Sequence, residues 1–95
     1  MRQDFLFPEK KLTFETVNGA LKSALHWILH QKSKQLTLDL SNIVFIDSAG
    51  VALLVELKRL THVEYKKNLV LKFSNQIMQM IQFYELEGLL ENIDE

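Results

Sequence analysis

Cysteine is absent from the 95-residue chain, so neither a disulfide framework nor a thiolate metal site can form. Proline occurs once and glycine three times, at positions where helices or strands could end. No apolar run approaches the roughly 20 residues of a membrane span, and the short stretch before Pro8 is too brief for the core of a signal peptide. The net charge of −1 gives no electrostatic bias toward nucleic acid. These absences indicate a cytoplasmic protein that does not bind DNA.

The composition is that of an ordinary globular domain, with 47% hydrophobic and 24% charged residues. A chain of this length has room for one hydrophobic core and little else. We therefore expect residues 1–95 to form a single domain.

Strand and helix patterns alternate along the chain. Short or alternating apolar runs predict strands near residues 5–7, 12–14, 36–40, 43–46 and 68–73. Helical periodicity predicts helices over about 15–32 and 48–62, and a third helix whose face carries Ile77, Met80, Ile81 and Tyr84. Strands that alternate with helices favour an α/β layer structure with parallel strands and right-handed crossovers.

The run FIDSAGVALLVELKR, which begins at Phe45, places an acid and a hydroxyl at a strand-to-helix junction. The first amides of a helix lack internal acceptors, so either Asp47 or Ser48 could be the N-cap. The same amides and the helix dipole also favour an anion there. Gly50 projects toward the apolar stripe, where a missing side chain would let the helix approach the sheet closely.

A helical wheel places Leu53, Leu54, Leu57 and Leu60 on the face that should pack on the sheet. On a face nearly opposite, two β-branched apolar residues appear where a solvated helix usually has none. We therefore predict a partner-binding surface made of Ser48, Val51, Val55, Lys58 and His62, supported by Asp47, Ala49 and Gly50.

Enzymatic and metal-binding patterns are incomplete. His26 and His30 have the spacing of two zinc ligands, but Trp27 stands where a zincin has glutamate, so solvated histidines are the better interpretation. Ser48 lacks a Gly-x-Ser-x-Gly elbow and a neighbouring base, which leaves a small hydrolase or phosphotransferase as a remote alternative. We expect no catalytic residue, no metal ligand and no cofactor.

The segment LTLDLSNIVFIDSAGVALLVELKR resembles the central segment of STAS domains, the family named for sulfate transporters and anti-sigma factor antagonists. The shared pattern is an aliphatic strand ending in Asp, then a hydroxyl residue, a small residue, Gly and an amphipathic helix. The resemblance covers nearly the whole chain. It implies an α/β, STAS-like fold with a central, mostly parallel sheet of four or five strands and about three helices packed on it.

Two branches of this family imply different functions. In bacterial anti-sigma factor antagonists a phosphorylated serine occupies the position of Ala49, and a methyl group cannot accept phosphate. The small stand-alone STAS subunits of the Mla phospholipid-transport ABC system instead carry Thr or Ser after the Asp, followed by a small residue, and this sequence is more similar to them.

The Mla resemblance implies a non-enzymatic cytoplasmic subunit that binds and stabilises or regulates the transporter ATPase, in a system that maintains outer-membrane lipid asymmetry. The subunit would reach the inner membrane only through this partner, and Ser48 would be its functional hydroxyl. The alternative is an anti-sigma factor antagonist that binds a kinase-type anti-sigma factor. Neighbouring genes for a permease, an ATPase and a periplasmic lipid carrier would favour transport.

Overall fold

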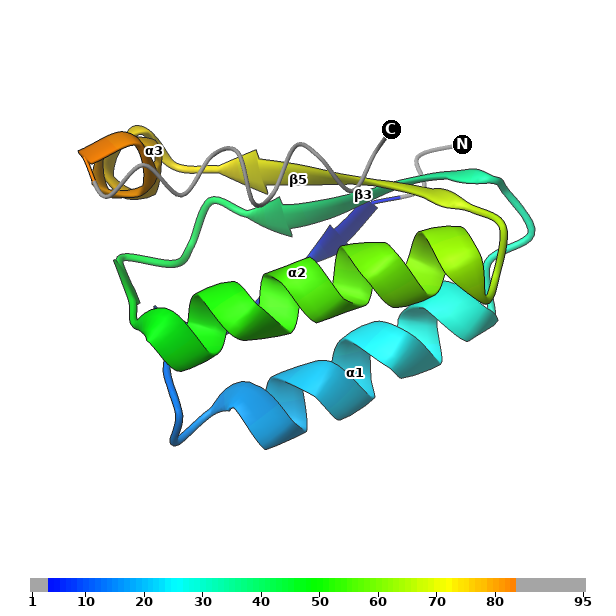
Figure 1. The fold of residues 1–95 in the computed structure, drawn as a ribbon, viewed down its shortest axis with the longest axis horizontal. Helices are drawn as coiled ribbons and strands as arrows, with labels where there is room; N and C mark the ends of the chain where they lie inside the picture. Colours follow the sequence, from blue (N-terminus) through cyan, green and yellow to red (C-terminus); the bar gives the residue numbers. More distant parts are fainter. Residues whose placement is uncertain (1–3, 84–95) are drawn as a thin grey trace.

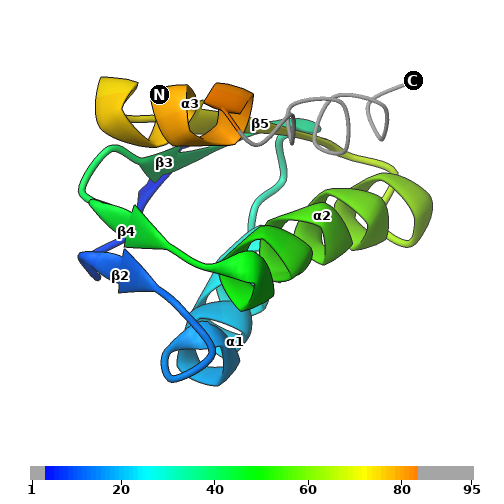
Figure 2. The same ribbon diagram turned by 60° about the vertical axis from the view of Figure 1, so that its left-hand side comes forward.

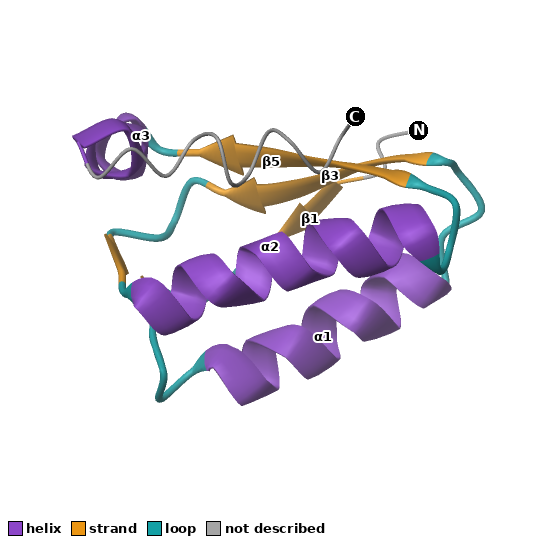
Figure 3. Cartoon of the chain, viewed as in Figure 1, coloured by secondary structure: helices purple, strands orange, loops and turns teal. Residues whose placement is uncertain are grey.

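The computed structural model describes residues 4–83. These residues form five strands and three helices in the order β-β-α-β-β-α-β-α, shown by type in Figure 3. The strands are β1 (Asp4–Leu6), β2 (Lys11–Leu12), β3 (Gln35–Leu40), β4 (Phe45–Ile46) and β5 (Asn68–Phe73). The helices are α1 (Val17–Leu29), α2 (Ser48–Val63) and α3 (Asn75–Phe83). The predicted order of elements is confirmed, whereas Tyr84, predicted on the face of the third helix, lies outside the described residues.

The strands pair in two parallel ladders. One ladder has the order β1-β3-β5, with Leu38 of β3 opposite Phe5 on one side and Leu71 on the other. The second joins β2 to β4, so that Leu12 lies opposite Ile46. The α/β class and the parallel strands are therefore confirmed, and the expected sheet of four or five strands is present as ladders of three and two. Figure 2 shows the short ladder beside the first turn of α2.

Helices α1 and α2 lie side by side and cover one face of the three-stranded ladder, while α3 lies beyond the end of β5 (Figures 1 and 2). The core is formed where these layers meet, because alternate residues of β3 point toward the helices. Its most deeply buried side chains come from both layers and include Ile28, Leu36, Leu38, Leu40, Leu54 and Leu57.

The chain between residues 4 and 83 contains no helix with the length and apolar character needed to cross a membrane. Its helices are instead amphipathic. In α1, for example, Ala20, Ala24 and Ile28 are buried at helical spacing, while Lys22, Ser23 and His26 are exposed.

Candidate functional site

Asp47 connects β4 to α2 in an extended conformation and caps the helix. Its Oδ1 accepts a hydrogen bond of 2.9 Å from the backbone N–H of Gly50, and its Oδ2 accepts one of 3.1 Å from the N–H of Phe14. One carboxylate thus satisfies an orphan amide of α2 and also holds the loop between β2 and α1. Of the two residues predicted as possible caps, Asp47 is the one that caps.

The same hydrogen bonds favour the ionised form of this carboxyl. The N–H of Gly50 is the largest influence and lowers the pKa of Asp47, the desolvation of the group opposes it, and the N–H of Phe14 lowers the pKa further. Asp47 is therefore a carboxylate at neutral pH, placed at the positive end of the α2 dipole.

Ser48 is left available because Asp47 caps the helix. It is the first residue of α2, its side chain is exposed, and within residues 4–83 its hydroxyl has no hydrogen-bond partner. Ala49 follows as a half-buried residue. A hydroxyl at this position can donate to or accept from a group outside the domain without loss of the cap.

Gly50 allows α2 to begin directly against β2. A Cβ built on this residue would lie 2.1 Å from the carbonyl oxygen of Leu12 and 2.7 Å from Cγ1 of Ile46. No real Cβ approaches backbone so closely, so the predicted role of Gly50 in close packing agrees with the geometry. Gly50 thereby fixes the position of the Ser48 turn relative to the short ladder.

A hollow of about 490 Å³ opens beside this turn and is mainly apolar. It lies between the end of β4, the first turn of α2 and α3, and its lining residues are Phe45, Ile46, Asp47, Ser48, Val51, Met80 and Ile81. The hydroxyl of Ser48 therefore stands next to hydrocarbon that a partner could cover.

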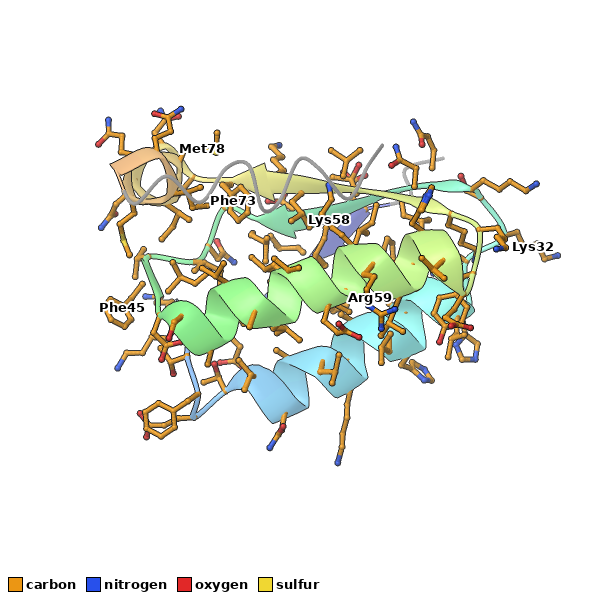
Figure 4. All side chains as sticks on the ribbon, in the orientation of Figure 1. Lys32, Phe45, Lys58, Arg59, Phe73 and Met78 are labelled. Carbon is orange, nitrogen blue, oxygen red and sulfur yellow. The ribbon has the colours of Figure 1, made fainter. Side chains whose placement is uncertain are left out.

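The sequence prediction missed Phe45 and Met80 as parts of this site. Phe45 is 50% exposed, and Figure 4 shows it at the end of the molecule where α2 begins. Strand alternation contained the signal, because a buried Ile46 turns its neighbour Phe45 outward. Met80 could not be found this way, since only the folded chain brings α3 next to the start of α2.

The predicted exposed surface is wrong for two of its five residues. Val51 and Lys58 are only 7% and 5% exposed, and Val55 is half-buried, whereas Ser48 and His62 are exposed. Figure 4 shows Lys58 extending from α2 toward the strands, and Arg59 lying on the other side of the helix.

The prediction centred the buried face of α2 on the wrong residues. Leu54, with Gly50 and Thr61 beside it on the wheel, occupies the middle of the buried arc, and Val51 and Lys58 lie within about 60° of it. Because α2 contacts α1, β4 and β5, it buries a wider arc than the four leucines indicate. The binding of a partner by these five residues stays a prediction.

The histidine pair at the C-terminal end of α1 lies away from this junction. His26 and His30 are exposed, their rings are 4.3 Å apart, and Nδ1 of His30 lies 2.7 Å from the carbonyl oxygen of His26. Among residues 4–83, no group of three or more His, Asp or Glu side chains is arranged to hold a metal ion.

A family model described as "Mlab, STAS domain" matches residues 11–91 of the chain. The chain belongs to this STAS domain family. The match begins at β2 and contains the β4–α2 junction, the hollow and all of α3. Members of the STAS family generally act through protein–protein interaction. No curated protein matches the chain.

The structure gives each residue of the STAS-like pattern a physical role at the junction. The Asp, hydroxyl, small residue and Gly of the STAS pattern correspond here to a cap, a free hydroxyl, a half-buried methyl and a close helix–strand contact. Three of these four residues build the turn, and Ser48 is the one whose functional group is directed to the surface.

Proposed function

We propose that this MlaB-like STAS domain is a non-enzymatic subunit that binds the cytoplasmic ATPase of an Mla-type phospholipid ABC transporter and stabilises or regulates it. It works in the cytoplasm without a cofactor and reaches the inner membrane through that partner. The proposal extends the family assignment to one partner.

The observation that carries the proposal is that Asp47 caps α2 while the hydroxyl of Ser48 stays exposed. Since the carboxylate of Asp47 caps α2, a structural role does not explain the exposed hydroxyl of Ser48. That hydroxyl borders the apolar hollow, and an apolar pocket beside one polar group is a common arrangement for an anchor side chain of a partner.

The contact surface that we propose is a revision of the predicted one. Phe45 and Ser48 form its centre, and Val55 continues it along the outer side of α2. His62, which was predicted as a contact, is exposed near the far end of the helix, where it lines a different hollow, and is left out of this surface. Val51 contributes as a wall of the hollow. Lys58 has too little exposed area to be a major contact.

The alternative partner is a kinase-type anti-sigma factor. Ala49 weighs against it, because a half-buried methyl group occupies the position at which that branch carries its phosphorylated serine. The ATPase is therefore the preferred partner.

Co-purification with the cognate ATPase tests the proposal, with Ser48→Glu as the main variant. Glutamate in the first turn of a helix interacts favourably with the dipole, so this change should not weaken the fold. It places bulk and charge at the centre of the contact, and we expect at least about a tenfold loss of affinity, comparable with the loss of one interface hot spot.

Ser23→Glu is the matched control, because Ser23 is an exposed serine on α1. A second pair compares Phe45→Ser with Val70→Ser, since these residues are 50% and 44% exposed. Binding that survives both Ser48→Glu and Phe45→Ser would reject this surface, and failure of the wild-type domain to bind the ATPase would reject the partner.

A further inference from the structure

The end of the molecule opposite Ser48 is basic. The loop from α1 to β3 and the loop from α2 to β5 meet there, because Nζ of Lys67 donates to the carbonyl oxygens of Ile28, at 3.1 Å, and of Gln31. Figure 4 shows Lys32 extending outward at this end, far from Phe45. Two helix C-termini and several lysines thus share one surface.

A hollow of about 510 Å³ lies among these lysines. Its lining residues are Lys34, His62, Val63, Lys66, Lys67 and Asn68. Within residues 4–83, Lys34 and Lys66 form no ion pair. The carboxyl group of Glu64 does not line the hollow. Its charge helps to raise the pKa of Arg59, to which Glu56 contributes more.

Helix dipoles explain only part of this cluster. The carbonyl groups at a helix C-terminus attract cations. At the end of α1 the ammonium group of Lys67 is this cation, since it donates two hydrogen bonds to carbonyl oxygens there. The ammonium groups of Lys34 and Lys66 are not used in this way. Because Lys67 covers the carbonyls of α1, those carbonyls present less negative potential to an anion in the hollow.

Lys66 occupies an unusual backbone position for a lysine. Its φ of 56° lies in the left-handed region, where glycine or asparagine avoids the strain that a longer side chain causes. Hydrogen bonds from the N–H groups of Lys67 and Asn68, to the carbonyls of Thr61 and Lys34, hold the turn. A function of the lysine side chain would explain why this strained residue is present at a surface turn.

We propose that this hollow binds an anionic phosphate group between Lys34, His62 and Lys66. Ammonium and imidazole N–H donors are suited to phosphate oxygens. The group favoured as its source is a phospholipid headgroup, because two exposed apolar residues, Leu29 and Val63, stand at the ends of the two helices beside the lysines. Lysines with hydrocarbon next to them are typical of contacts with an anionic membrane surface.

Sedimentation with vesicles tests the proposal on the full chain. The protein should bind vesicles that contain roughly 30% phosphatidylglycerol more strongly than vesicles of pure phosphatidylcholine. This binding should weaken as the salt concentration rises. The double variant Lys34→Gln, Lys66→Asn should bind about 25-fold more weakly, since each lysine near an anionic surface contributes roughly fivefold. Asparagine is chosen at position 66 because it tolerates the left-handed region.

Lys10→Gln combined with Lys22→Gln is the matched control, since it removes the same charge from exposed residues elsewhere. A second arm titrates glycerol 1-phosphate while the amide signals of Lys34, Lys66 and Asn68 are followed by NMR. Saturable shifts without vesicle binding would support a soluble phosphate compound as the source. Absence of both effects, or equal losses in the two double variants, would overturn the proposal. Neither outcome depends on whether the ATPase binds at Ser48.

Discussion

At the scale of single residues, the two glycines of the described helices have opposite roles. Gly50 is buried against the carbonyl of Leu12, whereas nothing lies within 4 Å of a Cβ built on Gly19. The sequence contained the reason for a glycine near position 50, because that residue projects toward the apolar stripe. It could not reveal that a backbone carbonyl, which cannot rotate away like a side chain, is the obstacle.

Replacing each of these two glycines by alanine should therefore change the free energy of unfolding in opposite directions. Gly50→Ala should lower the free energy of unfolding by about 1–3 kcal/mol or more, because the helix must move away from β2. Gly19→Ala should raise it by about 0.5–1 kcal/mol through better helix propensity. Urea denaturation of both variants measures the difference, and an unchanged midpoint for Gly50→Ala would contradict the close contact.

At the scale of elements, α2 shows what periodicity can and cannot predict. The spacing of its leucines located the helix to within a residue of its observed end at Val63, and it identified the Ser48 side as the outer one. It misplaced the centre of the buried face because Thr61 is fully buried, with Oγ1 donating to the carbonyl of Leu57, while Leu60 is only half-buried. A polar residue that satisfies its own hydroxyl within the helix can occupy the core, and hydrophobicity alone does not predict this.

The connection from α2 to the β2–α1 loop should be sensitive to acid. Hydrogen bonds from Gly50, and secondarily from Phe14, hold the folded pKa of Asp47 below its unfolded value of about 3.9. The stabilisation is therefore complete above about pH 4 and is lost as the pH falls through the folded pKa. Asp47→Asn keeps a residue that can cap but removes the charge, so its stability should fall less steeply below about pH 4.

Denaturation midpoints of the wild type and Asp47→Asn, compared from pH 2 to pH 7, measure this effect in a window set by the carboxylate pKa range of about 2–4. The hydrogen bond from Arg59 also lowers the pKa of Glu56, so the variant should keep a weaker acid dependence. Identical slopes for the two proteins would show that Asp47 does not hold the turn as a carboxylate.

At the scale of the whole molecule, the alternation of strands and helices was sufficient to predict an α/β fold with parallel strands. It did not predict two separate ladders, because β2 and β4 have only two residues each, and such short segments contain no pattern that specifies a partner strand. It also did not predict the hollow beside Ser48, which requires α3 to return to the start of α2.

The two ends of α2 present different chemistry. An apolar hollow with a free hydroxyl lies at its first turn, and a basic hollow lies beyond its last turn, about 24 Å away along 16 residues of helix. This separation would allow the domain to bind the ATPase at one end and a phosphate group at the other at the same time.

Hydrogen–deuterium exchange of the domain with and without its cognate ATPase tests the central claim most directly. The account predicts that complex formation slows exchange in peptides covering residues 45–52, around Phe45 and Ser48. Peptides from the basic end, covering residues 30–34 and 64–68, should keep their exchange rates. Slower exchange confined to the basic end, with residues 45–52 unchanged in a stable complex, would contradict it.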